Sequence, residues 1–409
     1  MDISVLILMF GIFSITYTLL NIVTSRVMKN RLVIKRDYTM QPTVTVMLSC
    51  FNEGEHAYRT VKSICECEYP HHLLEVIVVD DCSKDDTYEW IEKAKVEFPF
   101  IHTERNKRNM GKAATLARAA RMARNEILVS TDGDCILDKD AIKELAACYA
   151  DPTIGGVGGL IGINNTNDNL LSQMQTILYN ADFNLFKPME NVTRNVQCLG
   201  GPLVSYRRDL YLKVMPALEG NHFLGEPVTI GEDRLITQEV LKRGFGTYIT
   251  FKAQAWSGTP VTWSNFLKQQ MRWRRSACGQ WMLSIVNLRE FIKGRGIICA
   301  AGSLFPMIAN FTLFVFYIFL LQLGFFLPFI ITQIVMWALI IPVYGLIFNA
   351  TVGKRDTVDI QQTLDNPILS SWLMMIWFLV SITLVTPWAM LTLDDGGWVT
   401  RQDGMRGNA

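Results

Sequence analysis

Two aspartates separated by a single glycine, Asp132 and Asp134, directly follow the stretch 126–130, which is expected to form a buried strand. Two carboxylates spaced in this way at a strand end can share one hard divalent cation, Mg²⁺ or Mn²⁺. Such an ion can bridge the phosphates of a nucleotide-sugar and neutralise the charge that develops on a departing diphosphate. The same spacing is common in solvated turns, so its position at a strand end is what favours a metal site.

A second pair of acidic residues, Asp80 and Asp81, ends the expected strand 75–80. Carboxylates at this place suit hydrogen bonds to a uracil N–H or to a ribose hydroxyl. They also suit a helix N-cap cluster together with Ser83 and Asp85, and the two roles are compatible.

A glycine followed by a lysine, Gly111 and Lys112, opens the alanine-rich helix expected at 111–124. Glycine lets the backbone come close to a phosphate, the N-terminus of a helix favours an anion, and the lysine adds a positive charge. The sequence therefore indicates a phosphate site here, with an ordinary helix start as the alternative.

The stretch 231–234 reads Gly-Glu-Asp-Arg and precedes an amphipathic helix expected at 235–242. Attack by a sugar hydroxyl requires a carboxylate that accepts its proton, and Asp233 at the start of the helix can be that base. The alternative is an aspartate that caps the helix and forms a salt bridge.

The stretch 269–275 reads Gln-Gln-Met-Arg-Trp-Arg-Arg and lies on an expected amphipathic helix just before a long apolar region. Arg272 can bind diphosphate oxygens in a bidentate manner. Trp273 can stack on the face of an acceptor sugar, whose axial C–H groups suit an aromatic surface. The alternative is a basic and aromatic anchor at a membrane interface.

These clusters depend on a regular alternation of expected strands and helices. The strands are expected at 43–49, 75–80 and 126–130, and the helices at 53–67, 85–98 and 111–124. This alternation predicts a parallel sheet with right-handed crossovers. Ligands of such sheets bind beyond the carboxyl ends of the strands, which makes the polar clusters at those ends functional candidates.

Half of the residues are apolar and only 19% are charged, and the apolar residues concentrate in a few long runs. The chain therefore divides into soluble and lipid-facing parts. Apolar runs long enough to cross a bilayer occupy 5–23, about 302–323 and 328–349, and 369–393. Positive residues within 26–36 place the N-terminus outside and the following domain in the cytosol. The last run either spans, which puts the C-terminus outside, or is re-entrant or interfacial, which keeps it cytosolic.

The net charge of +1 and the lack of a long basic run give no argument for a nucleic-acid partner, and the nine scattered cysteines are expected to be reduced. The sequence predicts four segments. They are an N-terminal transmembrane helix with a basic flank (1–36), a cytosolic catalytic domain (37–260), amphipathic interfacial helices (261–296) and a C-terminal transmembrane or channel region with its tail (297–409).

Taken in order, the motifs resemble those of the processive family 2 glycosyltransferases. The pattern comprises Phe51-Asn52-Glu53, Val79-Asp80-Asp81, Gly111-Lys112, Asp132-Gly133-Asp134, Gly231-Glu232-Asp233 and Gln269-x-x-Arg272-Trp273. Within that family, three stretches look most like hyaluronan synthases, with chitin and chitooligosaccharide synthases next: 196–208, 223–235 and Trp398-Val399-Thr400-Arg401.

The resemblance implies an α/β GT-A fold, Rossmann-like with a mostly parallel sheet, plus an α-helical transmembrane region. It implies an inverting mechanism in which the acceptor hydroxyl attacks C1 of the donor sugar and Asp233 takes the proton. The catalytic residues it implies are Glu232, Asp233, Arg272 and Trp273. The metal residues it implies are Asp132 and Asp134, which would hold Mg²⁺ or Mn²⁺. The substrate-binding residues it implies are Phe51, Asn52, Glu53, Asp80, Asp81, Lys112, Asp132, Cys198, Gln269 and Arg401.

The resemblance further implies a monomeric, multi-pass enzyme of the plasma membrane that joins UDP-GlcNAc and UDP-GlcA into hyaluronan and passes the polymer through a channel. Phe51, Gly133, Glu232 and Val399 stand where that family usually has Tyr, Ser, Asp and Gly. The alternatives are a chitin-like or poly-GlcNAc synthase that uses UDP-GlcNAc only, and a non-processive transferase that adds one sugar to a lipid. An alternative of another class is a membrane transporter or binding protein, although no ionisable residue lies within 297–352.

Overall fold

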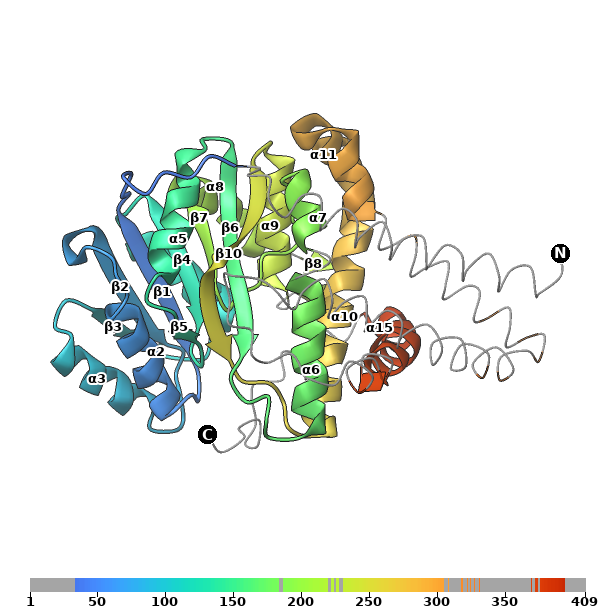
Figure 1. Ribbon diagram of the computed structural model, residues 1–409, viewed down its shortest axis with the longest axis horizontal. Helices are drawn as coiled ribbons and strands as arrows, with labels where there is room; N and C mark the ends of the chain where they lie inside the picture. Colours follow the sequence, from blue (N-terminus) through green and yellow to red (C-terminus); the bar gives the residue numbers. More distant parts are fainter. Residues whose placement is uncertain are drawn as a thin grey trace.

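The computed structural model describes residues 34–183, 187–219, 222–223, 226–227, 231–304 and 376–393, with a few residues between 308 and 373 (Figure 1). Several sequence-based predictions fall outside these residues: the apolar runs 5–23 and 328–349, most of 302–323, Trp398 and Arg401. Among the described residues, no helix combines the length and the apolar character that a membrane crossing requires.

An eight-stranded sheet forms the centre of the described domain, with the strand order β3-β2-β1-β4-β7-β6-β10-β5. Neighbours among β1 to β4 run parallel, as do β6 and β10, whereas β7 is antiparallel to both of its neighbours and β5 to β10. The strands are β1 (Val44–Cys50), β2 (Leu74–Asp80), β3 (His102–Arg105), β4 (Ile127–Asp132), β5 (Ile136–Leu137), β6 (Ile154–Ile163), β7 (Val204–Arg207) and β10 (Gly246–Ser257). The predicted mostly parallel sheet is confirmed.

The register of the three expected strands brings their polar ends together. Cys50 at the end of β1 pairs with Asp80 of β2, and Ser49 of β1 pairs with Asp132 of β4. The two acidic strand ends therefore flank the carboxyl end of β1 on either side, at the edge where parallel sheets bind ligands.

Helices cover the sheet and extend the domain away from it (Figure 1). The helices are α2 (Glu55–Cys65), α3 (Thr87–Glu97), α4 (Lys112–Met122), α5 (Ala141–Ala146), α6 (Leu170–Ala181), α7 (Lys187–Val192), α8 (Arg208–Glu219), α9 (Glu232–Lys242), α10 (Trp263–Val286), α11 (Leu288–Arg295) and α15 (Thr386–Leu391), preceded by the π-helix η4 (Phe378–Val385). Short 3-10 turns occupy His71–Leu73 and Ala147–Ala150, and His222–Phe223 pairs with Glu226–Pro227 as a two-stranded ribbon.

Two expectations about the helices are refined by the structure. The helices expected at 53–67, 85–98 and 111–124 are present with slightly shorter bounds. The start expected at residue 235 was wrong, because α9 begins at Glu232 and contains Asp233 in its first turn. Acidic residues favour this position because they face the positive end of the helix dipole.

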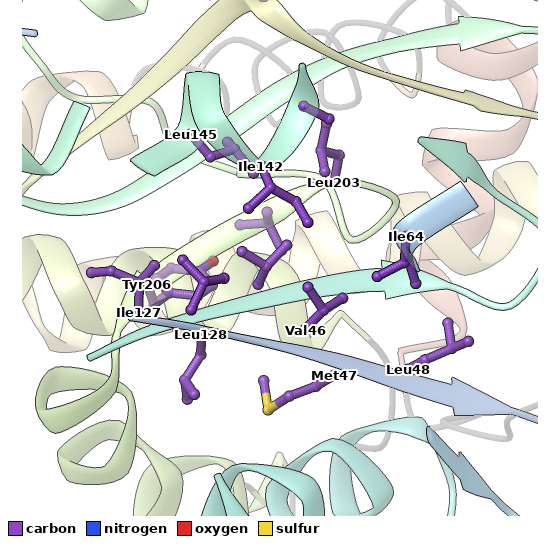
Figure 2. Close-up of a cluster of buried hydrophobic side chains, with 14 of the residues drawn as sticks. Val46, Met47, Leu48, Ile64, Ile127, Leu128, Ile142, Leu145, Leu203 and Tyr206 are labelled. Carbon is purple, nitrogen blue, oxygen red and sulfur yellow. The ribbon is translucent and has the colours of Figure 1, made fainter. Parts of the chain in front are cut away.

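The core of the domain lies on both faces of the sheet (Figure 2). Val46, Met47 and Leu48 are successive residues of β1, and all three are at most 1% exposed. Since successive strand residues point to opposite faces, this burial requires cover on both sides. The resulting core holds the strand ends, and thus the acidic residues that follow them, in fixed positions.

Candidate active site

The two aspartates that follow β4 lie beside a cysteine. Ligand atoms of Asp132, Asp134 and Cys135 all lie within 4.8 Å of one another. The turn between the aspartates is held by α2, since Thr60 Oγ1 donates a hydrogen bond to the carbonyl of Gly133 (3.0 Å). A Cβ at Gly133 would lie 2.9 Å from Glu53 Cγ, so the tight approach of Glu53 explains the glycine.

Lys112 connects this strand end to the motif at the start of α9. Its Nζ lies 2.6 Å from Asp132 Oδ1 and 3.2 Å from Glu232 Oε1. Burial lowers the pKa of Lys112, but the surrounding carboxylates, Asp132 first, outweigh it and hold the pKa well above its usual value. The lysine is therefore a permanent cation between two acidic elements that are far apart in the sequence.

Glu232 and Asp233 form the acidic first turn of α9. Burial and the neighbouring Asp233 raise the pKa of the Glu232 carboxyl, while Lys112 opposes the rise. Asp233 Oδ2 accepts a hydrogen bond from the backbone N–H of Gly201 (3.1 Å). A carboxylate oriented by a backbone donor, beside a second acid and a cation, can accept a proton from an alcohol.

Gly201 is a site residue that the sequence analysis included only within the stretch 196–208 and gave no role of its own. A Cβ at this position would lie 2.7 Å from Lys112 Nζ and 3.3 Å from Asp233 Oδ2. The loop therefore approaches both residues closely only because position 201 has no side chain. The sequence carries a weak signal, the run Gly200-Gly201-Pro202, which marks a special backbone conformation.

The pair at the end of β2 is buried and bonded within the protein. Asp80 is 0% exposed and pairs with Arg105 Nε (2.9 Å), and it also accepts a hydrogen bond from the Ser83 hydroxyl. Asp81 accepts hydrogen bonds from the backbone N–H groups of Met110 and Gly111, both at 2.8 Å. Asp81 thus fixes the loop that presents Lys112.

The expected N-cap cluster at the start of α3 is present only in part. The N-cap residue is Asp86, whose own side chain makes no capping hydrogen bond, whereas Asp85 accepts from the backbone N–H of Thr87, the first residue of α3 (3.1 Å). Asp80 accepts from the backbone N–H of Ser83 and does not reach the helix. Asp80 and Asp81 accept hydrogen bonds from loop N–H groups, because two backbone segments converge at the strand ends and their donors need acceptors there.

The segment after β1 is tied to the segment after β2. The backbone N–H of Asn52 donates to Ser83 Oγ (3.0 Å), and Asn52 Oδ1 accepts from the N–H of Lys84 (2.9 Å). The N–H of Glu53 donates to Thr87 Oγ1 (2.8 Å). Phe51 is half-buried at the start of this segment. These residues therefore line the same edge of the sheet as the acidic strand ends.

Helix α10 carries Gln269, Arg272 and Trp273 and packs against the start of α9. A Cβ at Gly231, whose φ is +83°, would overlap the hydroxyl of Ser276 on α10. Trp273 is 37% exposed and meets Tyr179 of α6 edge to face, with ring centroids 6.3 Å apart. The buried side-chain oxygen of Gln269 has no hydrogen-bond partner among the described residues.

Tyr179 lies between α10 and the metal-ligating candidates, and sequence reasoning missed it. Burial raises the pKa of its phenol, the charges of Cys135 and Asp132 add to the rise, and Arg272 opposes it. The tyrosine is thus within electrostatic reach of both the strand end and the arginine of α10. A single tyrosine on a helix carries no signal that distinguishes it from a core residue.

Cys198 lies on the loop that leads to Gly201. Burial raises the pKa of its thiol, and the nearby charge of Arg234 opposes that rise while Asp233 adds to it. Its carbonyl accepts a hydrogen bond from Lys187 Nζ (3.2 Å). The structure therefore places Cys198 near the α9 motif, whereas Arg401 lies outside the described residues.

The sequence profile described as glycosyltransferase like family 2 matches residues 42–276. The chain belongs to this family. It is therefore a glycosyltransferase, and residues from Phe51 to Trp273 fall within the matched region of the family 2 domain.

Two groups of named relatives match the same part of the chain. An N-acetylglucosaminyltransferase of Azorhizobium caulinodans is 30% identical over 62% of this chain and 65% of its own length. A hyaluronan synthase of Streptococcus pyogenes is 28% identical over 60% of this chain and 59% of its own length. The match thus spans less than two thirds of each of these relatives.

A solved structure confirms the GT-A fold of the family 2 domain. A mannosyltransferase from Pyrobaculum calidifontis, solved in complex with GDP-Man and Mn²⁺, superposes with a TM-score of 0.57 at 20% identity. The match covers 75% of this chain and 87% of the mannosyltransferase.

Proposed function

We propose that this family 2 glycosyltransferase is a processive, inverting synthase that polymerises UDP-sugars into a polysaccharide. The observation that carries the proposal is the position of Lys112, which contacts both Asp132 at a strand end and Glu232 beside Asp233. Lys112 thus has carboxylates suited to a diphosphate-bound metal on one side and a candidate base on the other. Attack by a hydroxyl on C1 with loss of UDP needs these two functions on opposite sides of the sugar.

On the base side, Asp233 would accept the proton of the acceptor hydroxyl. The N–H of Gly201 holds one oxygen of this carboxylate and so orients the group toward the acceptor. The raised pKa of Glu232 reduces the negative charge next to Asp233. Lys112 holds Glu232 by an ion pair and offers a positive charge to a phosphate.

On the donor side, Asp132 and Asp134 supply a set of ligand atoms that fits Mg²⁺ or Mn²⁺. Two carboxylates within 4.8 Å of each other match the preference of these ions for oxygen ligands, and Asp134 would be the direct ligand. A bound ion would neutralise charge on the UDP leaving group. Asp80, Asp81 and the segment Phe51-Asn52-Glu53 lie at the adjacent strand ends, where the nucleoside would bind.

On the acceptor side, Trp273 offers an exposed aromatic face at the end of the growing chain. Its edge-to-face contact with Tyr179 limits its rotation, and Arg272 on the preceding position would bind the diphosphate. Gln269, one turn earlier, has a buried side-chain oxygen without a partner in the described part of the chain, and this oxygen suits a sugar hydroxyl or amide. Cys198 would lie near the acceptor, and Arg401 near the nucleotide.

We further propose that the enzyme is a multi-pass protein of the plasma membrane, acts as a monomer, and has its catalytic domain in the cytosol. The apolar runs and the positive residues at 26–36 support this topology. Exposed apolar side chains at the end of α10 and around α11 suit a lipid interface. These side chains belong to Ile285, Val286, Ile292, Ile297 and Ile298. The polymer would leave through a channel that the apolar runs help to form.

The proposed product is hyaluronan, made from UDP-GlcNAc and UDP-GlcA in alternation. The alternative is a chitin-like or poly-GlcNAc polymer made from UDP-GlcNAc alone, which the similarity to an N-acetylglucosaminyltransferase supports. Purified full-length protein should be supplied with each UDP-sugar separately and with both together. Hyaluronan synthesis requires both donors and gives a polymer that hyaluronidase degrades. A resistant polymer from UDP-GlcNAc alone would overturn the hyaluronan proposal in favour of the alternative.

A further inference from the structure

Helix α10 presents two different faces to the rest of the molecule. Residues three and four apart share one face of a helix, so Gln269, Arg272, Trp273 and Ser276 lie on the same side. This side meets α9 at Gly231 and α6 at Tyr179. Gln270 and Arg274 lie on a neighbouring side and contact the C-terminal segment 376–393.

A polar cluster joins the second face of α10 to the π-helix η4. The Ser381 hydroxyl donates to Gln270 Oε1 (2.6 Å) and accepts hydrogen bonds from Arg274 Nε (3.1 Å) and a terminal nitrogen of the same guanidinium (3.0 Å). Trp377 Nε1 donates to the same Gln270 oxygen (3.3 Å). The Arg274 guanidinium lies over the Trp377 ring, 5.5 Å from its centroid. Each polar group of the cluster depends on at least one other.

Further contacts extend the attachment along α10. Arg275 donates two hydrogen bonds to Thr392 Oγ1, at 3.1 and 2.9 Å. Apolar contacts lie on both sides of the polar cluster. On one side Leu373 and Trp377 pack with Leu171, Met174, Ile177 and Phe266, and on the other Met390 and Leu393 pack with Ala277, Cys278 and Trp281. The C-terminal segment therefore holds α10 at several points along its length.

The hydrogen bonds of the cluster favour one rotation of α10 about its axis. Among the described residues, Arg274 has no carboxylate partner and relies on a hydroxyl and an aromatic face. Burial lowers the pKa of its guanidinium to about 10. A largely desolvated guanidinium loses stabilising hydrogen bonds when the helix turns, because Ser381 then lies out of reach of its Nε and terminal nitrogen. The wide turns of η4 place Ser381 opposite both Gln270 and Arg274.

We propose that Ser381, Gln270 and Arg274 form a positioning cluster that fixes the rotation of α10 and thereby holds Trp273 and Arg272 at the acceptor side of the site. The inference rests on the proposed polymerase function, since it concerns how the acceptor end is held. None of the three residues touches the reacting atoms. Their loss would let α10 turn, which would move the Trp273 ring away from the acceptor sugar while the donor carboxylates on β4 stay in place.

The test compares two fates of the donor in the same reaction: transfer of its sugar to the polymer, and hydrolysis, in which water attacks C1 and free sugar and UDP are released. Full-length enzyme is supplied with UDP-sugars, and total UDP release and sugar incorporated into polymer are measured together. Ser381→Ala should raise the ratio of UDP released to sugar incorporated about tenfold or more, the factor that corresponds to one lost hydrogen bond to a charged donor. A fraction of unfolded enzyme lowers both rates equally and leaves the ratio unchanged.

Thr386→Val provides a matched control in the same segment. The Thr386 hydroxyl is also buried, but it donates its hydrogen bond to the Ser381 carbonyl and not to a side chain of α10. This variant should retain the ratio of the unaltered enzyme. A ratio that Ser381→Ala leaves unchanged, or that both variants raise equally, would overturn the positioning role. If the unaltered enzyme incorporates no sugar from any UDP-sugar, the proposed function fails instead.

Discussion

Replacement of Lys112 by methionine removes the cation at the centre of the site while preserving most of the side-chain length. The side chains of Lys112, Asp132 and Glu232 are 18%, 26% and 9% exposed, so the contacts are largely shielded from water. Removing one partner of a fully buried pair costs about 3–5 kcal/mol, and partial exposure reduces this to roughly 2–3 kcal/mol here. For a domain of this size, that loss corresponds to a melting temperature lower by roughly 5–10 °C.

The loss of stability in Lys112→Met should depend on pH, and the direction of this dependence follows from the pKa of Glu232. Burial and Asp233 already raise the pKa of this carboxyl, and removing Lys112 raises it further. A carboxyl with a raised pKa binds its proton more tightly in the folded state, so stability falls as pH increases through that pKa. The deficit of the variant should therefore be smaller at pH 5 than at pH 8.

Thermal unfolding of the purified enzyme and the variant at pH 5 and pH 8 measures this prediction. Lys143→Met is the matched control, because Lys143 forms an exposed pair with Asp140 (3.5 Å) that contributes little. A Lys112→Met protein with the melting temperature of the original at pH 8, or with the same deficit at both pH values, would refute the electrostatic account.

Two further substitutions test the loops around the site. Gly201→Ala places a Cβ 2.7 Å from Lys112 Nζ. It should lower polymer synthesis, measured by sugar incorporation, at least about tenfold with little change in melting temperature. Unchanged synthesis would show that the loop does not approach the lysine. Asp81→Asn replaces a carboxylate that accepts two backbone N–H groups and should destabilise the domain by about 2 kcal/mol in denaturant unfolding. If this variant instead keeps its stability and loses only UDP affinity, Asp81 serves the nucleotide and not the loop.

The parallel half of the sheet could be predicted from the sequence because each strand is a short apolar run that ends in polar residues. The stretches 75–80 and 126–130 have this form, and their burial on both faces requires helices between them. Once the strands are parallel, their carboxyl ends must share an edge. This rule places Asp80 and Asp132 at the same edge, whereas their positions on either side of β1 depend on the strand order.

The other half of the site depends on contacts that no local pattern encodes. The ion pair between Lys112 and Glu232 joins α4 and α9, two helices that are far apart in the sequence. Strand β7 lies antiparallel between β4 and β6. Likewise, Tyr179 reaches Trp273 only because α6 and α10 pack together. The early start of α9 did carry a signal, since Glu232 and Asp233 are favourable in a first helical turn.

We propose that Asp233 accepts the proton of the acceptor hydroxyl, on the other side of Lys112 from Asp132 and Asp134. Sugar incorporation by Asp233→Asn tests it most directly, since asparagine keeps an oxygen for the Gly201 N–H and removes the base. Asp209→Asn, at a side chain that is 89% exposed on α8, is the matched control. The account predicts that Asp233→Asn loses roughly 10²–10⁴-fold in polymer synthesis with UDP-sugar binding retained, and that Asp209→Asn keeps full activity. An Asp233→Asn enzyme that polymerises at the rate of the original would contradict it.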